Sequence, residues 1–206
     1  MTKRKTRKMR KIRIIEQVSL DGVIQAPGEP DEDRDGDYAH GGWAMRYCDT
    51  AILEAIAAAQ GKSFDLLLGR RTYDIFASYW PKAESSPIAD GLNAATKFVA
   101  THRSDSLGWG PVEDLGADII EGARRVKSKA GPDLIVWGSS TLTSVLLDQG
   151  LVDEVVLAVY PLLLGRGKRF FSDSVDPREL ALVSTTAMPS GIILSAYKVA
   201  GPLKTG

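Results

Sequence analysis

The chain has 206 residues, of which 44% are hydrophobic and 25% charged, and its formal net charge is zero because 26 Lys and Arg balance 26 Asp and Glu. This composition excludes a disordered, collagen-like or coiled-coil protein, and the length predicts one domain whose core needs no disulfide or metal. The balanced charge argues against a nucleic-acid binder. No apolar run approaches the roughly 18 residues of a membrane-spanning helix. A single cysteine, Cys48, is typical of a protein of the reducing cytoplasm.

The chain opens with a basic segment, residues 1–11, which we expect to be a solvated, disordered tail because no apolar stretch follows to make a secretory signal. Hydrophobic periodicity then predicts a single domain over residues 12–200, followed by a short tail at 201–206. In chain order we expect a strand at 11–18, a loop at 25–46, a helix at 49–59, a strand at 64–68, helices at 73–79 and 88–95, a strand at 96–101, a helix at 117–130, a strand at 133–137, a helix at 142–149, and strands at 152–159, 179–187 and 192–199.

The order of these elements indicates the fold class. Strands and helices alternate as far as residue 149, and three strands without helices follow, the last two joined by a hairpin turn at Ser190-Gly191. The sequence therefore predicts an α/β fold with a mostly parallel central sheet and antiparallel strands at its C-terminal edge.

Three predicted strands end in short turns of one chemical type, Gly-Arg-Arg-Thr at 69–72, Thr-His-Arg-Ser at 101–104 and Gly-Ser-Ser-Thr at 138–141. Two of them open a helix, whose first N–H groups are unpaired and carry the positive end of the dipole. Glycine lets a phosphate approach the backbone, and arginines and hydroxyls add donors. Ligands of open α/β sheets bind at the carboxyl ends of the strands. Each turn alone is also an ordinary helix start or surface turn, but three together favour a ligand with several phosphates, such as NADPH.

Several other classes of site find no support. The Gly-x-Gly-x-x-Gly fingerprint and the P-loop pattern are absent, which argues against a Rossmann dehydrogenase and a P-loop hydrolase. His40 and His102 are the only histidines, with no Cys or acid at metal spacing, so we expect no metal site. No serine lies in a Gly-x-Ser-x-Gly motif, so hydrolase chemistry is not indicated.

Six short motifs together resemble one known family. They are Ser-Leu-Asp-Gly-Val-Ile at 19–24, Gly-Arg-Arg-Thr-Tyr at 69–73, Lys-Phe-Val-Ala-Thr-His-Arg at 97–103, Gly-Ser-Ser-Thr-Leu at 138–142, Gly-Leu-Val-Asp-Glu at 150–154 and Pro-Leu-Leu-Leu-Gly-Arg-Gly at 161–167. In this order the set resembles the dihydrofolate reductase superfamily, and more closely its branch around the reductase domain of the bifunctional riboflavin-biosynthesis deaminase-reductase. The resemblance runs from about residue 12 to about residue 199 and implies the three-layer fold of that superfamily.

The resemblance implies an NADPH-dependent reductase of a small heterocycle, and it favours a homodimer. The pyrophosphate would be held by Gly69, Arg70, Arg71 and Thr72 and by Gly138, Ser139, Ser140, Thr141 and Leu142. The adenosine 2′-phosphate would lie at Thr101, His102, Arg103 and Ser104, with Arg103 foremost. Val23 and Ile24 would lie against the nicotinamide. The cofactor supplies the hydride, while the protein aligns the reactants, excludes water and places a proton source.

Three residues are candidates for contact with the substrate, each with a structural alternative. Folate reductases carry an acid a few residues after a Trp, and here Asp49 follows Trp43 by six positions, so Asp49 is either a proton donor or anchor or a plain helix cap. Trp43 is either a platform for a flat ring or part of the core. Asp21 contacts the substrate or forms a local turn hydrogen bond.

Two further segments have alternative interpretations. Residues 31–36 imitate the start of a calcium loop, but its twelfth position would be Gly42 rather than Glu, so we expect a solvated acidic loop that rims the substrate pocket as a lid. Gly165-Arg166-Gly167 either closes a turn near the active rim or is a turn for its own sake.

These observations leave three functional hypotheses. The first is an NADPH-dependent reductase of a pterin-like or pyrimidine-like substrate. The second is a non-catalytic nucleotide-binding or regulatory protein that retains the fold. The third, pyrimidine reduction in riboflavin biosynthesis itself, is weakened because no zinc-deaminase domain precedes this one.

Overall fold

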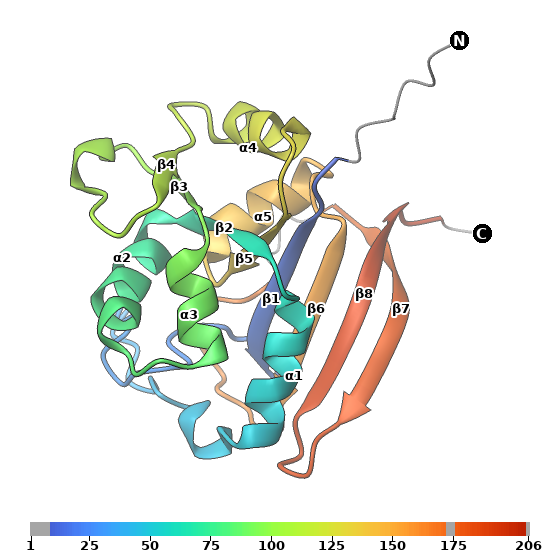
Figure 1. The fold of residues 1–206 in the computed structure, drawn as a ribbon. Helices are drawn as coiled ribbons and strands as arrows, with labels where there is room; N and C mark the ends of the chain where they lie inside the picture. The colour runs from blue at the N-terminus through green and yellow to red at the C-terminus, as the bar shows by residue number, and fades with distance from the viewer. Residues whose placement is uncertain (1–8, 172–175, 205–206) are drawn as a thin grey trace.

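A computed structural model describes residues 9–171 and 176–204 and contains one eight-stranded sheet. The strands are ordered β4-β3-β2-β5-β1-β6-β8-β7 (Figure 1). Those from β4 to β6 are parallel, β8 is antiparallel to β6, and β7 is antiparallel to β8. The predicted fold class is therefore confirmed. The strands are β1 (Ile12–Ser19), β2 (Phe64–Gly69), β3 (Lys97–Ala100), β4 (Val112–Asp114), β5 (Asp133–Trp137), β6 (Glu154–Tyr160), β7 (Arg178–Ala187) and β8 (Ile193–Pro202).

Helices cover both faces of the sheet. They are α1 (Thr50–Gln60), α2 (Arg70–Tyr79), α3 (Pro87–Ala94), α4 (Ile119–Ser128) and α5 (Ser140–Asp148), with short 3-10 helices at Met45–Tyr47, Trp80–Lys82 and Ser104–Ser106. Successive residues of a strand point to opposite faces. Accordingly Leu67 lies in a core cluster with α4 and α5, while Leu66 and Leu68 pack with α2 and α3. The central strands are thus buried on both sides, which explains their continuous apolar sequence.

Two helices begin earlier than their hydrophobic periodicity predicts. The α2 helix starts at Arg70 rather than at 73, and α5 at Ser140 rather than at 142. In both cases the helix follows the strand with almost no connection, so its polar first turn belongs to the helix. The short strand β4 was not predicted, because only one of its three residues is apolar.

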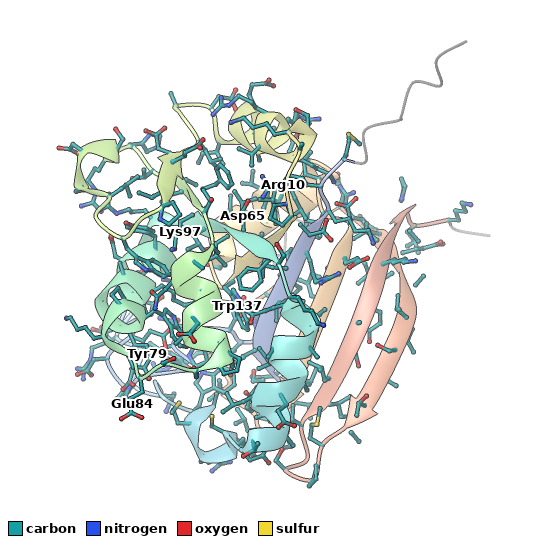
Figure 2. The ribbon with its side chains drawn as sticks, in the orientation of Figure 1. Arg10, Asp65, Tyr79, Glu84, Lys97 and Trp137 are labelled. Atoms are coloured by element: carbon teal, nitrogen blue, oxygen red, sulfur yellow. The ribbon has the colours of Figure 1, made fainter. Side chains whose placement is uncertain are left out.

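The N-terminal basic segment is not entirely a tail. Arg10 is only 3% exposed, its guanidinium forms an ion pair with Asp65, and its Nε donates to the carbonyl of Pro132 at 2.5 Å (Figure 2). The prediction of a solvated tail was therefore wrong at this position, and residues 1–8 lie outside the described residues. At the other end, β8 continues to Pro202 and so includes the first two residues of the predicted C-terminal tail. Within this extension Gly201 pairs with Glu179 of β7.

The β7 edge of the sheet is exposed. Leu182 and Val183 are each 57% exposed on this ten-residue strand. The homodimer implied by the family resemblance stays a prediction. Within residues 9–171 and 176–204, no helix is long and apolar enough to cross a membrane.

Candidate functional site

The three predicted phosphate-binding turns meet at one rim of the sheet. They follow β3, β2 and β5, which are adjacent parallel strands, so their carboxyl ends lie side by side. Ser139 Oγ accepts a hydrogen bond from the Gly69 N–H at 2.9 Å and donates to Thr72 Oγ1 at 2.8 Å. Arg70 Nη1 donates to the carbonyl of Arg103 at 2.7 Å. The structure thus brings the residues near 70, 103 and 139 together, as the sequence predicted.

The turn before α5 depends on backbone conformations that few residues adopt. Gly138 has a φ of 53° and Ser139 a φ of 59°, both in the left-handed region. A Cβ on Gly138 would also lie 3.3 Å from Thr72 Oγ1. Thr143 Oγ1 donates to the Gly138 carbonyl at 3.0 Å and fixes the turn from inside the helix. This geometry aims the unpaired first N–H groups of α5 at the rim.

The two arginines at the turns after β2 and β3, Arg70 and Arg103, have different roles. The Arg70 guanidinium is fully engaged, with Nε 2.8 Å from Asp74, Nη1 on the Arg103 carbonyl and Nη2 2.9 Å from Ser106 Oγ. Arg70 therefore positions the 101–106 turn. The Arg103 side chain is 68% exposed, and its nearest carboxylate among the described residues is Asp74 at 3.8 Å. Arg103 is the cation that a phosphate can reach.

The remaining members of the 101–104 turn are arranged around this arginine. Thr101 is buried, and its Oγ1 accepts from the Arg103 N–H at 3.0 Å. His102 and Ser104 are exposed. Thr101 thus fixes the backbone of the turn, while His102 and Ser104 face solvent beside Arg103.

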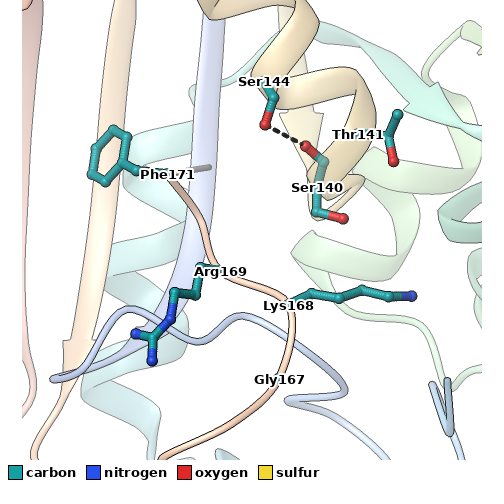
Figure 3. Close-up of a pocket in the computed structure, with 7 residues that line it drawn as sticks. All are labelled: Ser140, Thr141, Ser144, Gly167, Lys168, Arg169 and Phe171. Atoms are coloured by element: carbon teal, nitrogen blue, oxygen red, sulfur yellow. Dashed lines mark hydrogen bonds between the residues drawn. The ribbon is translucent and has the colours of Figure 1, made fainter. Parts of the chain in front are cut away.

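A cavity of about 500 Å³ lies at the N-terminus of α5 (Figure 3). Its α5 wall carries Ser140, Thr141 and Ser144, and its other wall is the segment from Gly167 to Phe171 with Lys168 and Arg169. A helix N-terminus, hydroxyls and two cations form a suitable environment for a phosphate group. Of the two interpretations of the 165–167 turn, the geometry supports the one that places it near the rim, because Gly167 lines the cavity. Lys168 and Arg169 were not predicted from the sequence, although they directly follow that turn.

Two of the rim's cations are already paired with carboxylates of the loop over residues 25–38, which we call the acidic loop. Lys168 Nζ lies 2.6 Å from Asp33 and 2.7 Å from Asp35. Arg71 pairs with the same two carboxylates, at 3.1 Å from Asp33. Hydrogen bonds from Arg71 and Lys168 lower the pKa of Asp35 to about 2. These four side chains fasten the acidic loop to the cavity wall through Lys168 and to α2 through Arg71.

The description of the acidic loop as solvated was therefore wrong in part. Asp33 is only 8% exposed and accepts a hydrogen bond from Gln25 Nε2 at 3.2 Å, while Asp31 faces solvent and pairs with Arg34 of the same loop. The sequence showed a run of acids, but their partners lie far along the chain.

Replacing Asp33 and Asp35 together by Asn is expected to tighten the binding of inorganic pyrophosphate or NADPH by about 3- to 10-fold, because the ion pairs that compete with the anion lie near the surface and are individually weak. The substitution keeps the shape of both side chains but releases Arg71 and Lys168 for an anion. Isothermal titration calorimetry measures the effect, and Asp31→Asn is the matched control because Asp31 pairs only within its loop. Weaker binding by the double variant would show that the two carboxylates support the anion site rather than compete for it.

Two of the substrate-contact candidates have structural roles. Asp49 caps α1, accepting from the Ile52 N–H at 2.9 Å, and its residue is exposed. Trp43 is 8% exposed, donates from Nε1 to the Gln25 carbonyl at 2.8 Å and packs edge-on against Tyr160 at 5.2 Å. The helix-cap and core interpretations are the ones that the geometry supports.

Asp21 also holds structure together. Its carboxylate accepts from Ser19 Oγ at 2.6 Å and from the N–H groups of Leu164 at 3.1 Å and Gly165 at 2.7 Å. Partial burial alone would raise the pKa of Asp21, but these hydrogen bonds outweigh it and the pKa is lowered. Of the two interpretations of Asp21, the local turn hydrogen bond is present in the contact with Ser19, and the contacts with Leu164 and Gly165 also fasten the loop before the cavity wall to the end of β1.

The residues expected near the nicotinamide are buried. Val23 is fully buried and forms an isolated antiparallel bridge with Arg169, and Ile24 is 6% exposed in the core cluster that includes α5. Among the described residues, no three His, Cys, Asp or Glu side chains gather as metal ligands.

One further residue of this region was missed by the sequence analysis. Glu16 lies inside β1, is 2% exposed, and its Oε1 accepts from the Gln17 N–H at 3.0 Å. Its Oε2 has no hydrogen-bond partner in the structure. The available signal was a glutamate in the sequence Ile-Ile-Glu-Gln-Val, within a strand that the structure buries on both faces.

The sequence is similar to a known protein family and to a protein of Bacillus subtilis. Residues 112–194 match the model of the RibD C-terminal domain family. The chain is 26% identical over 195 residues to the uncharacterised protein YyaP of Bacillus subtilis, covering 92% of this chain and 95% of that protein.

Two solved structures have a similar fold. A pyrimidine reductase-like protein from Corynebacterium diphtheriae is 17% identical with a TM-score of 0.59, covering 92% of each chain. Dihydrofolate reductase from Enterococcus faecalis, solved with NADP(H), is 14% identical with a TM-score of 0.60, covering 92% of this chain and 96% of that one. The chain has the fold of the dihydrofolate reductase superfamily and resembles the branch of that superfamily defined by the RibD reductase domain.

Proposed function

We propose that the protein is an NADPH-dependent oxidoreductase that reduces a small pterin-like or pyrimidine-like heterocycle. The observation that carries this proposal is the convergence of the three turns at adjacent carboxyl strand ends, with Ser139 joined to Gly69 and Arg70 joined to Arg103. A dinucleotide with three phosphates matches a rim that offers a helix N-terminus, a cationic cavity and a separate exposed arginine.

The residues present fit this cofactor. The pyrophosphate would be held by the first turns of α2 and α5 together with Lys168, and the 2′-phosphate by Arg103. When bound, NADPH supplies the hydride. The chain itself binds the phosphates, and Ser139 and Arg70 keep the three turns in register so that the ligand is oriented. The ion pairs of Asp33 and Asp35 with Lys168 hold the acidic loop against the segment that lines the cavity.

The second candidate is a nucleotide-binding protein without turnover. The observation that favours it is that Asp33 and Asp35 already neutralise Arg71 and Lys168. In that case the carboxylates would act as internal substitutes for phosphate, and nucleotide binding would serve to move the loop. The exposed free thiol of Cys48 fits a reducing compartment such as the cytoplasm for either candidate.

Turnover separates the two candidates. Purified protein is mixed with NADPH and, in turn, with dihydropterins and aminopyrimidinones, and the absorbance of the reduced nicotinamide is followed. We expect oxidation of NADPH with at least one of these heterocycles, and slower oxidation of NADH at equal concentration. Saturable NADPH binding with no oxidation across the series would favour the non-catalytic candidate, and no binding at all would contradict both.

A further inference from the structure

The structure contains a buried carboxyl group that none of the roles above uses. Glu16 lies in the middle of β1, and its neighbours on the same face of the strand, Ile14 and Val18, belong to the core cluster that includes Leu142 of α5. Glu16 therefore lies between the sheet and α5, the helix whose N-terminus forms one wall of the cavity.

The position of Glu16 along the strand places it next to the phosphate-binding turn. Ile15 is paired with Trp137, the last residue of β5, so Glu16 is level with Gly138, where that turn begins. The Gly138 backbone is close enough to the carboxyl to favour its ionised form slightly.

A carboxyl group in this position is costly to ionise. Burial, opposed by the Gln17 N–H and increased by the charge of Glu32, raises the pKa of Glu16 to about 8. Among the described residues Glu32 is the titratable group whose charge reaches Glu16, and burial also raises the pKa of Glu32 itself. At neutral pH Glu16 is therefore a neutral acid with a proton to give, and its Oε2 has no hydrogen-bond partner within residues 9–171 and 176–204.

We propose that the Glu16 carboxyl is the proton donor of the reductase site, an inference that rests on the proposed function. Hydride addition to the carbon of a C=N bond oxidises the nicotinamide and leaves the ring nitrogen in need of one proton. Glu16 gives up its proton to that nitrogen and becomes a carboxylate, and it recovers a proton from solvent before the next turnover. A positive charge on the oxidised nicotinamide favours the carboxylate, so release of the proton is easiest when the hydride has left.

Proton release on nucleotide binding tests this role without a substrate. NADP⁺ and NADPH are titrated into the protein at pH 7 by calorimetry in buffers of different ionisation enthalpy, which gives the protons released by each. Both nucleotides carry the same phosphates, so their difference reports the charge of the nicotinamide. We expect NADP⁺ to release about 0.5 to 1 proton more than NADPH from the wild-type protein, and this difference to disappear in Glu16→Gln. Glu113→Gln, an exposed acid on β4, is the matched control and should keep the difference.

The outcomes distinguish this inference from the proposed function. If both nucleotides bind but release equal numbers of protons, or if the difference persists in Glu16→Gln, Glu16 is not the donor while cofactor binding stands. If neither nucleotide binds, both proposals fail.

Stability and turnover provide independent readouts of the same variant. The folded state binds more protons than the unfolded state between pH 4.5 and about 8, so the wild type should lose stability relative to Glu16→Gln as pH rises through that range. With any heterocycle that the wild type reduces, we expect the turnover rate of Glu16→Gln to be lower by a factor of about 100 or more, while its affinity for NADPH is unchanged. The turnover rate of the wild type should fall above about pH 8. If Glu16→Gln had the same turnover rate as the wild type and the same dependence of that rate on pH, the inference would be overturned.

Discussion

Arg103→Ala is expected to weaken NADPH binding by about tenfold or more, because a charge-assisted hydrogen bond to a phosphate contributes roughly 1.5–3 kcal/mol before solvent exposure reduces it. NADH, which lacks the 2′-phosphate, should bind the variant as it binds the wild type. The reason is that Arg103 is largely exposed at the turn after β3, while the neighbouring Arg70 already donates hydrogen bonds to Asp74, Ser106 and the Arg103 carbonyl. Fluorescence titration with both nucleotides measures the two affinities.

The control for this experiment is Lys62→Ala. Lys62 is also an exposed cation, but it precedes β2. It therefore lies at the amino end of that strand, whereas the rim lies at the carboxyl ends. It should leave both affinities unchanged. Equal losses for NADPH and NADH in Arg103→Ala would show that the 2′-phosphate lies elsewhere, and a loss in Lys62→Ala of the same size would indicate only a general effect of net charge.

Arg10→Ala should produce the largest loss of stability, about 3–5 kcal/mol in the free energy of unfolding, because removal of one partner leaves a buried charge unpaired. The Arg10 side chain is 2% exposed and Asp65 13%, and the Arg10 Nε also satisfies the Pro132 carbonyl. Asp65 in turn accepts a hydrogen bond from the Thr96 N–H at 3.0 Å. The pair therefore joins the amino ends of β1, β2 and β3, at the end of the strands opposite the rim. Urea unfolding followed by circular dichroism gives the free energy.

Lys11→Ala is the matched control for this substitution. Lys11 is the next residue and pairs with Glu154 at 2.5 Å, but its side chain is 38% exposed, so its loss should cost less than about 1 kcal/mol. If Arg10→Ala were no more destabilising than Lys11→Ala, the buried ion pair would not hold the N-terminus of β1 to the sheet.

Structural features that depend on a short stretch of sequence were predicted well. The strands and helices of the α/β part follow from apolar runs and periodicity, and the three turns could be placed on one rim because each follows its strand directly. Asp49 was recognised as a possible cap from its place before an apolar helix, and the structure has it in that role. The helix starts at Arg70 and Ser140 were missed because polar first turns carry no hydrophobic signal.

Features that depend on distant partners were not predicted. Arg10 looked like one more basic residue of a tail, and its partner Asp65 is 55 positions away. Lys168 and Asp35 are 133 positions apart, so nothing local shows that the acidic loop is fastened to the cavity. Glu16 looked like the polar position of an ordinary strand, because the covering of its face by α5 exists only in the folded chain.

The most direct test of a dinucleotide site on this rim is titration of isotope-labelled protein with NADPH, followed by the backbone amide NMR signals. We expect saturable shifts at residues 69–72, 101–104 and 138–142 and at Lys168, with little change along β7 and β8. Shifts confined to other surfaces, or no saturation at millimolar NADPH, would contradict a dinucleotide site at the carboxyl ends of β2, β3 and β5.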